Sequence, residues 1–171
     1  MAESFGYGFG ANVVETVTAS IANTETRVIG ATCSANRIKV GTTVRCRIAG
    51  LLNNTTSAST SVWRLRMGPT TLTGPIVASW SNIIGIVARV DCPFVVDVHM
   101  VCLTAGASGT AWGVIAVNCN TATVLGIVTS QTTAAVTVDT TAALQVEVTC
   151  ISGAATTTWN CITRSLEFLN T

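Results

Sequence analysis

Two short segments alternate arginine with apolar residues, as a half-buried β-strand does. VRCRI contains Arg45 and Arg47, and WRLRM contains Arg64 and Arg66. Successive side chains of a strand point to opposite faces, so each pair shares the face turned away from the core. Exposed guanidinium groups at this spacing can bind phosphates or sugars. An arginine-lined binding surface is therefore the first chemistry to consider.

The only histidine, His99, lies two residues from Asp97 on the same outward phase of VVDVHMV. An acid beside a histidine does hydrolytic chemistry only with a positioned nucleophile, and the GxSxG nucleophile elbow is absent. The acidic residues also lack the DxD, HxH and HExxH spacings of metal sites. We predict a non-enzymatic protein with no catalytic residues, no metal and no cofactor.

The charge balance argues against nucleic acid as a partner. The net charge is only +1, so no basic field attracts a phosphate backbone. Outward acids offer cross-strand partners to the arginines. We interpret the charged residues as the outer face of one sheet, with contact to a partner protein as the alternative. This predicted face comprises Arg45, Arg47, Arg64, Arg66, Asp97, His99 and Glu147.

The elements that must position these residues are strands. The chain has 29 threonines, and β-branched residues favour pleated backbone. Period-two alternation and turn signals such as NNTTSAST, MGPTTLTGP and DCP predict about 8–10 short antiparallel strands and no helix. Such strands in one domain indicate a sandwich or barrel. The predicted strands cover residues 16–21, 28–33, 39–48, 61–67, 72–80, 83–90, 95–103, 112–118, 124–129 and 143–151. Further candidate strands lie at residues 135–138 and 159–169.

The seven cysteines are odd in number and contain no CxxC pair, so they indicate neither a disulfide framework nor a zinc site. Cys46, Cys102 and Cys150 fall on the apolar phase of their strands. We predict that most cysteines are buried and reduced, in a protein made in the cytoplasm. MAESFGYGFG lacks the features of a secretory signal, and no apolar run reaches the roughly 20 residues of a spanning helix. We expect no membrane partner.

Two runs, IIGIVARV and TVLGIV, are apolar on both strand phases, as strands buried on both faces are. Charged residues make up 10% of the chain, against about 25% in typical soluble domains. Because no helix is available to cover these strands, we predict that another copy of the chain does. The candidate subunit interface comprises Ile83, Ile84, Ile86, Val87, Val124, Leu125, Ile127 and Val128.

Residues 1–15 are predicted to form an N-terminal arm, and residues 16–171 to form the domain. FGYGFG alternates Phe5, Tyr7 and Phe9 with small residues, which suits an extended arm that inserts aromatic rings into a neighbouring surface. A disordered terminus is the alternative. A phosphate-binding loop is excluded because the segment has no lysine, preceding strand or following helix.

Four segments together resemble a family of small bacteriophage virion proteins with a trimeric jelly-roll fold. They are TETRVIGATCSANRIKVGTTVRCRIAGLL (24–52), SVWRLRMGPTTL (61–72), TVDTTAALQVEVTC (137–150) and WNCITRSLEFL (159–169). The resemblance implies a single jelly-roll β-sandwich that assembles as a homotrimer and has a structural role in the virion. Its members serve as capsid decoration or cement proteins, as head fibres or as tail tips.

The chain contains neither the coiled coil nor the β-helical repeats that usually carry a tail tip. We therefore expect a decoration protein on the capsid exterior, made in the host cytoplasm, whose arm contacts the major capsid protein. The alternative is a receptor-binding tip or fibre protein that contacts a host surface receptor. A carbohydrate-binding module or an intracellular enzyme is the third hypothesis.

Overall fold

The computed structural model describes residues 13–15, 19–21, 23–54, 59–84, 89–119, 127–131 and 134–169. Within these ranges all twelve regular elements are strands, which confirms the all-β prediction. The same ranges contain no helix long and apolar enough to cross a membrane. The strands are β1 (Val13–Glu15), β2 (Ala19–Ile21), β3 (Thr26–Cys33), β4 (Thr43–Asn54), β5 (Ser59–Gly68), β6 (Ile76–Ile84), β7 (Arg89–Thr104), β8 (Gly109–Cys119), β9 (Ile127–Gln131), β10 (Val136–Val138), β11 (Leu144–Ser152) and β12 (Thr157–Leu169).

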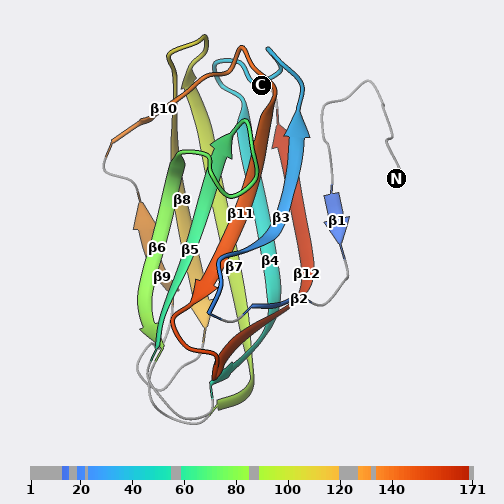
Figure 1. Ribbon diagram of the computed structural model, residues 1–171, viewed down its shortest axis with the longest axis vertical. Coiled ribbons are helices and arrows are strands. Elements are labelled where there is room, and N and C mark those ends of the chain that lie inside the picture. The colour runs from blue at the N-terminus through green and yellow to red at the C-terminus, as the bar shows by residue number, and fades with distance from the viewer. Residues whose placement is uncertain are drawn as a thin grey trace.

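The strands form two antiparallel sheets that pack face to face (Figure 1). The large sheet has the order β1-β12-β4-β7-β8-β10, with β2 also paired to β12 and β9 to β8. The small sheet has the order β3-β11-β5-β6. At one side β6 packs against β8 and β9, and at the other β3 packs against β12. The described part of the chain is therefore a β-sandwich around one core.

Alternation of buried and accessible residues, clearest in β4 and β8, directs one side of the strands into that core. In β4 every second residue from Val44 to Asn54 is buried, and β8 alternates in the same way. The inward side chains of the two sheets meet between them. The largest fully buried side chains are Trp63, Trp80, Trp159, Phe94, Ile21, Ile29, Ile48, Leu52, Leu65, Met67 and Met100.

Three aromatic rings pack together in the core, and the strand between two of them contains a glycine that a larger residue could not replace. The ring of Trp63 lies 5.3 Å from that of Trp159, which lies 4.8 Å from that of Phe94. Gly50, in β4, separates the strands that carry Phe94 and Trp159. A Cβ atom on Gly50 would lie 1.9 Å from the carbonyl oxygen of Asn160, so only glycine fits here. The buried indole nitrogen of Trp159 donates to Ser61 Oγ at 3.0 Å.

Several predicted boundaries are wrong. Residues 83–90 do not form one strand, because β6 ends at Ile84 in the small sheet and β7 begins at Arg89 in the large sheet. The DCP segment is part of β7 rather than a turn. Asp91 there has a φ of 55°, and the pairing with β4 shifts register between Leu52 and Asn54. The turn-forming residues Asp91 and Pro93 therefore lie at a local irregularity within the strand.

The end of the predicted arm also belongs to the sheet. Val13, Val14 and Glu15 form β1 and pair with β12 at the edge of the large sheet (Figure 1). This pairing with β12 is a long-range contact that the sequence did not predict, and the division into an arm and a domain stays a prediction. The three aromatic residues of the predicted arm, Phe5, Tyr7 and Phe9, lie outside the described residues.

The cysteines are free, and most of them are buried, as predicted. Cys46, Cys102, Cys119, Cys150 and Cys161 are buried, and the other two are half-buried. Burial disfavours a thiolate. It raises the pKa of the Cys119 thiol to about 11. Burial likewise raises the pKa of the Cys161 thiol to about 12.

We expect the native thiols to react slowly with a thiolate-selective reagent at pH 8. The raised pKa values keep the buried groups protonated, and the core excludes the reagent. Timed labelling by mass spectrometry should show at most two cysteines modified quickly in the native protein and all seven in denaturant. Rapid native labelling of five or more would contradict the burial seen here.

Candidate functional site

The four predicted arginines lie on opposite faces of the molecule. Arg45 and Arg47 belong to β4 in the large sheet, whereas Arg64 and Arg66 belong to β5 in the small sheet. All four take the outward phase of their strands. The prediction of one shared charged face is wrong, because the outward faces of two stacked sheets point in opposite directions.

On the small sheet, the arginines hold an acid that the sequence analysis did not single out. Arg64 donates to Glu25 Oε2 at 2.6 Å, and Arg66 donates through Nε to Glu25 Oε1 at 3.0 Å. Thr149 Oγ1 adds a third donor to Oε1 at 2.7 Å. These four residues, the Glu25 clamp, tie the segment before β3 across β11 and β5. Sequence reasoning missed Glu25 because its partners are 39 to 124 residues away.

Glu147 lies on β11 of the same sheet, and its side chain is buried rather than exposed. Its side chain is 1% exposed, and Arg27 Nε lies 3.9 Å from its Oε2. Its other carboxylate oxygen accepts a hydrogen bond from the backbone nitrogen of Leu72, in the turn between β5 and β6. Gly30 leaves the space, since a Cβ atom there would lie 2.8 Å from both Arg27 Nε and Glu147 Cβ. Glu147 lies opposite Arg66 in the strand register, but Arg66 forms its ion pair with Glu25.

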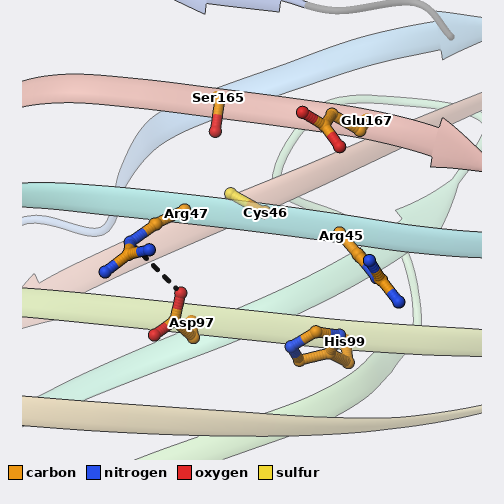
Figure 2. Close-up of a pocket in the computed structure, with 7 residues that line it drawn as sticks. All are labelled: Arg45, Cys46, Arg47, Asp97, His99, Ser165 and Glu167. Atoms are coloured by element: carbon orange, nitrogen blue, oxygen red, sulfur yellow. Dashed lines mark ion pairs between the residues drawn. The ribbon is translucent and has the colours of Figure 1, made fainter.

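The outer face of the large sheet remains open. Six polar residues there stand in two cross-strand rows over β12, β4 and β7, one row being Ser165, Arg47 and Asp97 and the other Glu167, Arg45 and His99. They surround a shallow hollow of about 200 Å³, which Cys46 also lines (Figure 2). We call this the outer-face hollow. It contains four of the seven residues predicted for the charged face.

The polar side chains of the outer-face hollow form few interactions with one another. Arg47 Nε lies 3.6 Å from Asp97 Oδ1, and the two side chains are 69% and 44% exposed. Figure 2 shows this ion pair between neighbouring strands. In the described part of the chain, no hydrogen bond or ion pair engages the side chains of Arg45, His99 or Glu167. The hollow therefore presents unused donors and acceptors to solvent.

The arrangement favours binding over proton transfer. Asp97 faces Arg47 rather than His99, and no hydrogen bond links His99 to Asp97 or Ser165 in the described ranges. A relay needs both links. Among the same residues, no group of three or more His, Cys, Asp and Glu side chains is placed to hold a metal ion. The chemistry that this surface offers is charge and hydrogen-bond recognition.

An apolar band adjoins the outer-face hollow on β7 and β8. Val101 lies opposite Trp112 and His99 lies opposite Val114, so the outward phase of these strands becomes apolar away from β4. The sequence shows this signal as VVDVHMV and WGVIAV, where both phases contain apolar residues. We define the apolar band as the half-buried outward residues Val95, Val101, Trp112, Val114 and Ala116.

Four of the eight residues predicted for the subunit interface lie on two strands, and the other four lie outside the described residues. Ile83 and Ile84 belong to β6, and Ile127 and Val128 belong to β9. These strands are in different sheets but pack against one another. β9 also extends the large sheet beside β8 and the apolar band. The remaining members, Ile86, Val87, Val124 and Leu125, lie outside the described residues.

Comparisons with known proteins identify no relative of this chain. No family model, no curated protein and no solved structure matches the chain. The resemblance to phage virion proteins therefore stays a prediction.

The two arginine pairs should differ in their effect on stability. Arg66→Ala removes donors to Glu25 and to the carbonyl oxygen of Gly74, so we expect the free energy of unfolding to fall by about 1–3 kcal/mol. Arg45→Ala, its exposed counterpart, should change it by less than about 0.5 kcal/mol. Urea unfolding of both variants tests this, and equal losses would argue against the clamp.

The Glu25 clamp should also make stability depend on pH. Burial alone raises the pKa of Glu25, but hydrogen bonds from Arg66 and Thr149 and the nearby arginine charges lower it below its usual value of 4.5. A depressed pKa contributes stability above the unfolded value, and that contribution is lost as pH falls through the folded value. We expect stability to drop below about pH 4.5.

The matched variant for this pH dependence is Glu25→Gln, which keeps the shape of the side chain without a titrating carboxylate. Its free energy of unfolding should be lower at pH 7 and should fall less between pH 5 and pH 3 than that of the parent. Denaturant unfolding across this range gives both quantities. Identical slopes for the two proteins would assign the acid sensitivity to other carboxylates.

Proposed function

We propose that the chain is a non-enzymatic structural protein of a bacteriophage virion, a jelly-roll β-sandwich that assembles as a homotrimer and decorates the capsid exterior. The all-β sandwich is compatible with the jelly-roll topology that the resemblance implies. The observation that carries the proposal is the apolar band on the outer face of the large sheet.

The apolar band lies where a free-standing sandwich would present polar residues. An antiparallel sheet with one solvated face normally alternates apolar and polar side chains, yet Val101, Trp112 and Val114 are apolar on the outward phase of β7 and β8. The chain has only 17 charged residues in 171, so few charges offset this surface. Burial against copies of the same chain removes it from water.

The Glu25 clamp suits the same role. It fastens the segment before β3 to two strands of the small sheet, and Glu147 fastens the turn between β5 and β6 to that sheet. The sandwich thus has one outer face whose charged groups pair within the molecule, and another on which the apolar band lies beside the outer-face hollow. Contacts from three copies would add through multivalency, with the predicted arm of Phe5, Tyr7 and Phe9 contacting the major capsid protein.

The oligomeric state tests the physical part of this proposal. Light scattering at micromolar concentration should give a mass near three times 17.7 kDa before any capsid is present. Val114→Asp puts a charge into the apolar band and should shift the protein toward monomer. Val40→Asp is the control, because Val40 is 64% exposed in a turn and should tolerate the charge.

A monodisperse monomer, or a trimer that Val114→Asp leaves intact, would contradict the assignment of the apolar band. The virion role has its own measurement, the number of copies in purified particles by quantitative mass spectrometry. Hundreds of copies would agree with capsid decoration, whereas a few copies would place the protein in a tail or fibre.

A further inference from the structure

We propose that the outer-face hollow binds a sugar carboxylate, with the carboxylate on Arg45 and the sugar hydroxyl groups on Glu167 and Asp97. This inference does not depend on the virion role. It rests on the residues of the hollow that neither the core nor the Glu25 clamp uses. They present charged groups of both signs on one open face (Figure 2).

Arg45 is the anchor of the site. Its guanidinium projects from the central strand of the hollow, between Glu167 on β12 and His99 on β7, yet neither residue forms an ion pair or hydrogen bond with it. A guanidinium presents donors in a planar fork that matches the two oxygens of a carboxylate. Arg47 is less available, since Asp97 lies 3.6 Å away.

The two carboxylates of the hollow select the rest of the ligand. Ionised Glu167 and Asp97 are acceptors only, so they can receive hydrogen bonds from hydroxyl groups. They also repel further negative charge, which disfavours a phosphate or sulfate dianion. Arg45, Arg47, Asp97 and Glu167 sum to zero formal charge. The site therefore has no surplus positive charge to hold a dianion. A ligand with one carboxylate for Arg45 and several hydroxyl groups for Glu167 and Asp97 suits these groups, and a sugar acid has that chemistry.

The dimensions agree with a single sugar ring. The hollow measures about 200 Å³ and is open to solvent, which leaves room for one monosaccharide unit and not for a buried oligosaccharide. The polar rows lie on adjacent hydrogen-bonded strands about 4.8 Å apart, a spacing that a pyranose with its substituents can span. Ser165 is small and leaves space beside Arg47.

Methyl β-D-glucuronide is a suitable probe, and methyl β-D-glucoside is its neutral counterpart. NMR titration of the assembled protein should show amide shift changes on β4, β7 and β12 with the glucuronide, at an affinity at least tenfold above that for the glucoside. Arg45→Gln should weaken glucuronide binding at least tenfold. Arg45→Lys should weaken it nearly as much, because the charge remains but the fork is lost.

Two controls separate a sugar site from a simple anion site. Arg37→Gln alters an exposed arginine outside the hollow and should leave the affinity unchanged. Glu167→Ala should weaken glucuronide binding without weakening acetate binding. Acetate binding as tightly as the glucuronide, equal affinity for the glucoside, or an unchanged affinity in Arg45→Gln would each overturn the proposal.

Discussion

Trp63 of the small sheet lies edge-on to Trp159 of the large sheet, with ring centres 5.3 Å apart, and 6.1 Å from Phe94. This contact across the layers joins the sheets at the centre of the core. Gly50, on the strand between Phe94 and Trp159, has no room for a side chain, because a Cβ atom there would collide with the backbone of β12. Between the joined layers lie apolar side chains and a few hydrogen-bonded polar groups such as Ser61. The arginine pairs of β4 and β5 lie on the two outer faces.

Those two outer faces have different physical roles. On the small sheet, arginines, Glu25 and Glu147 bind one another and the backbone, so the charge is satisfied within the molecule. On the large sheet, Arg45, His99 and Glu167 are left facing solvent, next to an apolar band. Hydrogen bonds to partly buried charges contribute more than exposed ion pairs. The outer face of the small sheet therefore contributes stability. The outer face of the large sheet is the one on which we propose assembly and sugar binding.

The difference between the two outer faces explains why two similar arginine segments have different surroundings. VRCRI and WRLRM both alternate arginine with apolar residues, and both were expected on one charged face. Arg66 is only 12% exposed, whereas Arg47 is 69% exposed. Arg66 donates hydrogen bonds to Glu25 and to the carbonyl oxygen of Gly74, whereas Arg47 has only its 3.6 Å contact with Asp97 in the described ranges. Period two specifies which side of its strand a residue occupies, but not what packs over that side.

The sequence by itself determined the all-β class, the inward phase of Trp63 and the burial of most cysteines, because these follow from local alternation and β-branched composition. It also placed Asp97 and Glu147 as cross-strand partners of arginines. Only the tertiary structure decided that β4 and β5 enter different sheets, that residues 83–90 divide between two strands, and that Glu25 is the acid held by Arg64 and Arg66. The physical reason is distance along the chain. Strand pairing and ion pairs between residues tens of positions apart depend on how the sheets stack, which no local pattern encodes.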